Sequence, residues 1–392
     1  MSKPVDRIRP ADWSIPASYT PLEPVDEYMI HSNRQPALIP LTTDLRAYDR
    51  MWFTVQDLKG QLYLVMGIGF YPNLQTADAH AQVIYKGRHI YIHTHRPLGR
   101  NRMNMKVGPI EFENVEPFKE WRISLEENNY GIEFDIRWLD TKKPLYELID
   151  MNAIIGHAGS TANAEATAGY ETFGVMDGWV KFDGELIKVS PETSSGSRDH
   201  HWGERDGVGG PGRSRKGEGG GQTGGHPLCG QWVDFNDWSV WGWKDLPPID
   251  SEREVLKYTF DPDYTLKFDE TTRLFTEGII TNTYRSGDTR ELHWRRIDNQ
   301  IAFLRCGGYG GVNGGTPDGD LWWGADVGEL IGGGACDLSK PENQIRLSGG
   351  NEHLCEVSCG NETTIGIFEP VEPTAYEWCR DRRTPKFRLW ED

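Results

Sequence analysis

The sequence predicts an all-β protein of two antiparallel domains, and three observations lead to this expectation. Short runs of β-branched and aromatic residues recur roughly every ten residues along most of the chain. The 45 glycines and 23 prolines favour frequent turns over long helices. With 392 residues, the chain is too long for one small core and suits two domains.

The first half of the chain carries the strand patterns of one domain. Residues 1–40 are rich in proline and are expected to form an extended arm over the body. The turn at 57–60, which ends in glycine, predicts a β-hairpin. One short helix is expected at 161–168. The expected strands are 50–56, 61–69, 79–85, 88–96, 103–107, 110–114, 120–126, 131–139, 170–180 and 185–189.

The second half repeats this style and predicts a second domain. Two glycine-rich stretches interrupt the chain: 207–225, expected to be a surface loop or a lid, and an insertion at 307–334. We therefore expect domains at 41–206 and 230–392, joined by a glycine-rich loop at 207–229. The expected strands are 231–243, 254–259, 265–268, 276–284, 291–297, 301–306, 344–347, 353–359 and 363–369.

The composition argues against several classes of partner and location. A formal net charge of −17 disfavours nucleic acid and anionic membrane surfaces, which attract basic patches. No apolar run is long enough to span a membrane, so no membrane insertion is expected. The N-terminal residues lack the apolar stretch of a secretory signal, so we expect a cytoplasmic protein with its six cysteines reduced.

The densest group of reactive side chains lies in the middle of the chain. If a strand runs there, alternation places Asp199 and His201 on one face and Arg198, His200 and Trp202 on the other. The first face could carry a carboxyl and an imidazole as an acid/base pair. The second could set a cation beside an aromatic wall. A salt-bridged junction between the two halves would use the same residue types, because ion-pair networks imitate active sites.

No motif in the sequence predicts a metal or a cofactor. His93 and His95 share one face of an expected strand and could bind a metal if a third ligand, such as His80, approached. Nothing supplies that ligand at a characteristic spacing, so we expect these imidazoles to line a barrel mouth where substrate binds. The sequence has no Walker loop, no nucleophile elbow and no dinucleotide fingerprint.

Tryptophans cluster around and after the central motif. Their apolar faces could wall a pocket for an isoprenoid, polyketide or steroid skeleton and could stabilise a carbocation. For any single tryptophan, core packing explains the same residue. The tryptophans considered are Trp202, Trp232, Trp238, Trp241, Trp243, Trp322 and Trp323.

The central stretch also resembles a known family. Residues 196–206 read Gly-Ser-Arg-Asp-His-His-Trp-Gly-Glu-Arg-Asp. This resembles the Gly-x-Arg-Asp-His-x-Trp-Gly-x-Arg-Asp signature of the carotenoid 1,2-hydratase (hydroxyneurosporene synthase)/AttH-like family. Stretches at 107–123, 131–135 and 365–369 support it, so the resemblance covers most of the chain, with the central motif its specific part.

The resemblance implies two tandem lipocalin-like β-barrel domains with the motif near their junction. It also implies a hydratase, cyclase or related activity on lipophilic substrates without a cofactor. It carries Asp199, His200, Trp202 and Asp206 over as candidate catalytic residues. The family often has a small residue where His201 stands, and the glycine-rich stretches are longer than usual here, so the resemblance does not extend to the carotenoid substrate.

Two hypotheses follow for the function. The first is a cofactor-independent hydratase/dehydratase, isomerase or cyclase, a lyase or isomerase in which Asp199, tuned by His201, protonates an alkene or leaving group. Asp206 or the second imidazole, His200, then orients water. The alternative is a non-catalytic protein that binds a lipophilic ligand. The expected partner is a small lipophilic substrate, and a homodimer is compatible with the sequence. The predicted substrate-binding residues are Arg198, Trp202, Trp241, Trp243, Trp323, His93 and His95.

One observation separates the two hypotheses. A buried carboxylate that faces the cavity favours the enzyme. A carboxylate paired to both Arg198 and Arg205 at the outer surface favours the binding protein, in which the motif only holds the structure together.

Overall fold

Strands form nearly all of the regular structure in the computed structural model, which confirms the all-β prediction. In the described part of the chain, the α-helices are two short segments, α2 (Pro341–Leu347) and α3 (Thr374–Asp381). No helix among these residues is long and apolar enough to cross a membrane. The structure describes residues 22, 24–30, 43–99, 101–150, 166–205, 207–210, 229–235, 237–242, 260–284, 286–308, 322–348, 350–370, 374–381 and 385–390.

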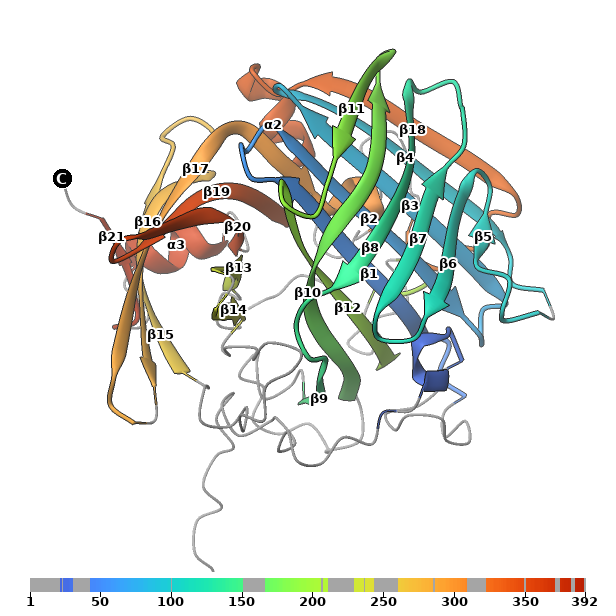
Figure 1. Cartoon of the computed structure of the whole chain (residues 1–392), viewed down its shortest axis with the longest axis horizontal. Helices are drawn as coiled ribbons and strands as arrows, with labels where there is room; N and C mark the ends of the chain where they lie inside the picture. Colours follow the sequence, from blue (N-terminus) through green and yellow to red (C-terminus); the bar gives the residue numbers. More distant parts are fainter. Residues whose placement is uncertain are drawn as a thin grey trace, which may run out of the picture.

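The larger of two sheets is built mainly from the first half of the chain (Figure 1). Its strands are β1 (Ala47–Asp57), β2 (Leu62–Tyr71), β3 (Thr76–Tyr85), β4 (Arg88–Pro97), β5 (Lys106–Val107), β6 (Ile110–Glu116), β7 (Glu120–Leu125), β8 (Ile132–Asp140), β9 (Leu145–Asp150), β10 (Ala166–Phe182), β11 (Glu185–Val189), β12 (Ser194–Glu204) and β18 (Leu330–Asp337). Their spatial order is β18-β4-β3-β2-β1-β12-β10-β8-β7-β6-β5, and β9 and β11 also pair with β10. The central motif therefore lies on β12, between β1 and β10.

The smaller sheet comes from the second half of the chain. Its strands are β13 (Cys229–Asp234), β14 (Ser239–Trp241), β15 (Phe260–Phe268), β16 (Phe275–Tyr284), β17 (Thr289–Phe303), β19 (Asn351–Cys359), β20 (Glu362–Pro370) and β21 (Phe387–Leu389). Their order is β14-β13-β20-β19-β17-β16-β15-β21, and only the β15–β21 pair is parallel. The two antiparallel sheets agree with the predicted architecture.

Three local predictions are wrong. Of the helix expected at 161–168, the structure describes residues 166–168, and these are not helical because they begin β10. The single strand expected at 231–243 is two paired strands, β13 and β14. The strand expected at 344–347 lies in α2, which begins at Pro341, a residue whose fixed φ suits the first helical position. Its apolar residues, Ile345 and Leu347, alternate as they would in a strand and so gave the wrong prediction.

The strands expected at 291–297 and 301–306 are largely one strand. β17 runs through both, and the register with β19 shifts between Arg296 and Ile301. Asn299 within this shift has a positive φ of 60°, which marks an irregularity of the strand rather than its end. After β17 the chain turns into a short 3-10 helix, η5 (Leu304–Gly307). The strand expected at 254–259 lies outside the described residues.

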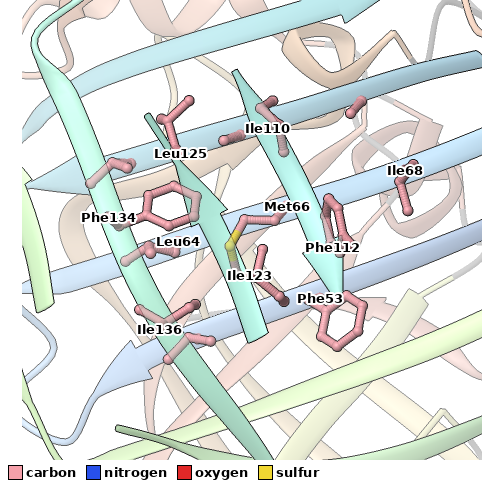
Figure 2. Packing of buried hydrophobic residues seen from close by; sticks show 14 of the residues in the cluster. Phe53, Leu64, Met66, Ile68, Ile110, Phe112, Ile123, Leu125, Phe134 and Ile136 are labelled. Carbon is pink, nitrogen blue, oxygen red and sulfur yellow. The ribbon is translucent and has the colours of Figure 1, made fainter. Parts of the chain in front are cut away.

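The first sheet folds back on itself around an apolar core. Strands β1–β4 place one face against β6–β8, and the two layers cross in Figure 2. The first layer contributes Phe53, Leu64, Met66 and Ile68, and the second contributes Ile110, Phe112, Ile123, Leu125, Phe134 and Ile136. Each side chain follows the alternation of its strand, so the opposite face of β1–β4 is left for other contacts.

That opposite face packs against the second sheet. Trp52 of β1 and Tyr63 of β2 share an apolar cluster with Phe303 of β17, Leu354 of β19 and Ile367 of β20. The glycine-rich insertion also contributes to the first sheet, because β18 pairs with β4 along its edge (Figure 1). The domain limits at 41–206 and 230–392 stay a prediction. The space between the sheets is a second core, and one face of β12 borders it.

Gly196 lies at a tightly packed point of β12, so a substitution there tests this packing. It lies opposite Gly174 of β10, and the Trp138 ring covers both. A Cβ atom at Gly196 would lie 2.7 Å from Trp138 Cζ3 and 2.2 Å from the Thr54 carbonyl oxygen. We expect Gly196→Ala to lower the free energy of unfolding by about 1–3 kcal/mol in urea denaturation. Leu186→Ala, at a side chain 58% exposed on β11, serves as the control, with an expected change within about 0.5 kcal/mol. Equal effects of the two substitutions would contradict this packing.

Candidate functional site

Strand β12 has the two faces that the sequence predicts. Arg198, His200 and Trp202 are fully buried on one face. The side chains of Asp199 and His201 on the other face retain 23% and 15% of their exposure. His201 Nδ1 lies 3.2 Å from Asp199 Oδ2, so these two groups form the expected carboxyl–imidazole pair.

We call the face of β12 that carries Arg198, His200 and Trp202 the inner face. There, two buried carboxylates hold Arg198. Its Nε and Nη2 atoms donate to Asp140 at 2.8 and 2.6 Å, and its Nη1 donates to Glu27 at 3.2 Å. Glu27 ends a 3-10 turn, η2 (Pro24–Glu27), within the predicted arm. Burial opposes the charge of Glu27, but Arg198 and a hydrogen bond from Tyr170 keep the pKa of this carboxyl below its usual value. The network therefore ties the N-terminal segment to β8 and β12.

His200 belongs to the same inner network. Its Nε2 lies 2.6 Å from Asp49 Oδ1, and its Nδ1 lies 3.2 Å from the Tyr170 hydroxyl. The Trp202 ring packs edge-on against His200 and Tyr170, with centroids 5.3 and 6.3 Å away. The structure thus places His200 and Trp202, both predicted site residues, on the opposite side of the strand from Asp199.

We call the face of β12 that carries Asp199 and His201 the outer face, and it meets the second sheet. Four carboxyl groups from both sheets interact there. Asp199 lies opposite Glu171 of β10 and opposite Trp52 of β1 in the strand register. Glu352 of β19 and Glu369 of β20 come from the second sheet, and the negative charge of Asp199 raises the pKa of each. Glu171 and Glu352 are only 5% and 2% exposed, whereas Asp199 and Glu369 are half-buried. We call Asp199, Glu171, Glu352 and Glu369 the carboxyl cluster.

Three members of the carboxyl cluster have raised pKa values. Burial, reinforced by the charge of Asp199, raises the pKa of Glu171 well above its usual value. Burial and the charges of Glu369 and Asp199 do the same for the pKa of Glu352. Burial raises the pKa of Glu369 to about 7, with Arg205 opposing this shift and Asp199 adding to it. The carboxyl cluster therefore holds protons near neutral pH.

Aromatic side chains surround the carboxyl cluster. Trp52, Trp232 and Trp241 contact one another with ring centroids 5.8–6.2 Å apart, and we call them the tryptophan cluster. Trp241 hydrogen-bonds Glu171, and the Tyr63 hydroxyl donates to Glu352 at 2.8 Å. The site thus sets proton-holding carboxyls beside large apolar faces.

The predicted residues His93 and His95 lie on the same face of the first sheet, farther along it. Both are buried on β4, and burial lowers the pKa of each imidazole. Arg50 contacts His80 at 3.2 Å and stacks on the Trp323 ring at 4.5 Å. Among the residues that the structure describes, no group of three histidine, cysteine, aspartate or glutamate side chains is arranged to hold a metal. The histidines form a buried group with Arg50, which contacts Trp323.

Sequence reasoning missed Glu171, Glu352 and Glu369. A signal was present at Glu369, which shares the strand phase of the buried residues Ile365 and Ile367. An acid in phase with a buried face needs a partner or a function. The sequence offered no means to pair β19 and β20 with β12 across the two sheets. Asp206 and Trp243, also predicted for the site, lie outside the described residues.

Comparisons with known proteins connect the chain to one family. The model of a family described as "Family of unknown function (DUF8625)" matches residues 22–235. This range contains Glu171 and Asp199 but not Glu352 and Glu369. No curated protein matches the chain.

The chain is also similar to a solved structure, that of kievitone hydratase from Nectria haematococca. The identity is 10%, and the match covers 82% of this chain and 88% of that chain, with a TM-score of 0.43. A likeness at this level carries no argument about activity, so the site is interpreted from its own residues.

Arg198 and an exposed arginine give a matched test of the inner network. Removing one partner from a buried ion pair leaves the other charges uncompensated, so Arg198→Met is expected to cost about 3–5 kcal/mol of stability. Arg122, which pairs with Asp135 and is 52% exposed, provides the control Arg122→Met, expected to cost less than about 1 kcal/mol. Urea denaturation of both variants measures the difference, and a cost below 1 kcal/mol for Arg198→Met would exclude the structural role of the network.

Proposed function

The chain belongs to the family of unknown function DUF8625, and we propose that it is an enzyme whose carboxyl cluster performs acid/base chemistry on a lipophilic substrate. The reaction class is hydration or dehydration, isomerisation or cyclisation, without a cofactor. The observation that carries the proposal is the convergence of Asp199, Glu171, Glu352 and Glu369 from both sheets beside the tryptophan cluster.

Glu369 is the proposed general acid. An acid that protonates an alkene or a departing hydroxyl must keep its proton near the working pH. Glu369 has a pKa of about 7, whereas an ordinary glutamate has lost its proton well below that pH. It is also half-buried rather than enclosed, so a substrate can approach it. The sequence assigned this role to Asp199, and the raised pKa of Glu369 is the reason for transferring it.

Asp199 and His201 are the proposed base. Their contact at 3.2 Å sets the imidazole beside a carboxylate, an arrangement that orients the ring toward its partner. In a hydration, the proton of Glu369 goes to one alkene carbon and water bonds to the other. The proton that this water loses goes to the Asp199–His201 pair, and exchange with solvent restores both groups. Dehydration runs these steps in reverse.

The alternative, a non-catalytic binding protein, predicts that Arg198 and Arg205 both form ion pairs with Asp199. Arg198 instead bonds Glu27 and Asp140 on the opposite face of β12. Arg205 stacks on the Trp323 ring at 4.8 Å and acts on Glu369. The orientation of Arg198 supports the enzyme, because it leaves Asp199 on the face of β12 that meets Glu352 and Glu369 of the second sheet.

Isotope incorporation tests the proposed chemistry. Purified protein is incubated in ¹⁸O-labelled water with a panel of prenylated phenols, terpenoid alkenes and tertiary alcohols, and products are analysed by mass spectrometry. We expect the label to enter a product with wild-type protein, and Glu369→Gln and Asp199→Asn each to lower the rate about 10²–10⁴-fold while the fold survives. Glu356→Gln, an exposed position on β19, is the control and should keep the wild-type rate. Rates unchanged in both site variants would refute the assignment.

The rate should also depend on pH in a defined direction. The acid acts only in its protonated form, so its contribution to the rate is present below the pKa of Glu369, about 7, and is lost as pH rises through it. At one pH unit above this pKa, kcat should be about tenfold lower than its maximum at lower pH. A pH–rate profile on the labelled product measures this, and a rate that rises through pH 7 would assign the critical group to a base instead.

A further inference from the structure

We infer that the same site takes lipophilic amines and binds them as ammonium ions between the carboxyl cluster and the tryptophan cluster. This names a substrate class for the proposed enzyme. It rests on the proposed function for the chemistry that follows binding, but not for the binding itself.

The carboxyl cluster can adapt its charge to a bound cation. Four carboxyl groups meet between the sheets, and burial keeps protons on three of them by raising their pKa values. Arg205 acts on Glu369, and His201 pairs with Asp199. Arg205 is itself stacked on the Trp323 ring. Natural proteins pair buried charges of opposite sign, because like charges in a low dielectric repel strongly. A bound ammonium ion would supply a positive charge against which these carboxyls can lose their protons and ionise.

Glu171 provides a second, independent observation. Its side chain is 5% exposed, and its Oε2 atom has no hydrogen-bond partner among the described residues. Glu171 lies directly opposite Asp199 in the register of β10 and β12, so the two carboxyls share one face of the sheet. A buried polar atom without a partner is costly, and the N–H of a protonated amine would donate to this oxygen once Glu171 gives up its proton.

The tryptophan cluster suits the apolar part and the charge of such a ligand. Trp52 and Trp241 meet edge-on at 87°, and Trp232 and Trp241 at 85°. Trp232 is partly exposed, so the cluster extends from the buried carboxyls toward solvent. Indole faces attract ammonium ions and also bury hydrocarbon, which favours an amine on an apolar skeleton over a small inorganic cation.

Binding should release protons from the carboxyl cluster. A cation favours the charged carboxylates, so its affinity is expected to rise as pH increases through the pKa of Glu369, about 7. The titratable and charged groups that face the cluster from the packed elements are Asp199, His201, Glu171, Glu352, Glu369, Tyr63, Cys355 and Arg205.

Two pairs of isosteres test the inference by titration calorimetry on the full chain. Protonated N,N-dimethylbenzylamine is compared with isobutylbenzene, which has the same shape without charge. Benzyltrimethylammonium, which keeps the charge but lacks the N–H donor, is compared with neopentylbenzene. We expect each cation to bind about tenfold tighter than its neutral isostere. The protonated amine should also bind tighter than the quaternary ion, because only it can donate to Glu171.

Variants locate the binding. Glu171→Gln and Glu369→Gln should each weaken the amine about tenfold without weakening isobutylbenzene, and the control Glu356→Gln should change neither. Thermal melting of each variant confirms that it is folded. Because Glu369 is only half-buried, Glu369→Gln gives a reading even if Glu171→Gln fails to fold.

The outcomes separate this inference from the proposed function. Equal affinity for charged and neutral isosteres, or amine affinity unchanged in Glu369→Gln, overturns the amine site, whatever the isotope experiment shows. Preferential amine binding that depends on Glu369 upholds it, even if no member of the alkene and alcohol panel takes up the label.

Discussion

The structure depends on the burial of the Arg198 guanidinium. A charge with no exposure to water is tolerated only when its donors are satisfied by carboxylates, and Glu27 and Asp140 do this from two distant parts of the chain. Because the side chains of a strand alternate, fixing Arg198 inward also fixes Asp199 outward. A slip of one residue in β12 would bury Asp199 in the network and turn Arg198 toward the second sheet.

The two faces of β12 bury charge in opposite ways. On the inner face, carboxylates balance the charge of Arg198, and His200 is hydrogen-bonded to Asp49. Such a charge-balanced network is typical of groups that stabilise the fold. On the outer face, carboxyls gather with little compensation, and three of them respond by keeping protons. Stability alone would not select such an arrangement, since apolar residues of similar volume would pack there without the electrostatic cost. Its presence is better explained by a ligand or a reaction that uses it.

The sequence predicted the strands and the faces of β12 well, because both follow from local alternation. Asp199 and His201 were placed together for the same reason. Glu352 and Glu369 could not be predicted as their neighbours, since that contact depends on how one sheet packs on another rather than on any local pattern. The strand at 330–337 was also missed, because its glycine-rich sequence has the composition of a loop, and only its pairing with β4 reveals it.

The acid strength of Glu369 is set by residues from three separate regions of the chain. Burial and the charge of Asp199 raise its pKa, whereas Arg205 lowers it. Arg205 in turn stacks against Trp323, which comes from the glycine-rich insertion and also stacks against Arg50. The insertion therefore contributes to the chemistry of the site through Trp323, even though it supplies no member of the carboxyl cluster.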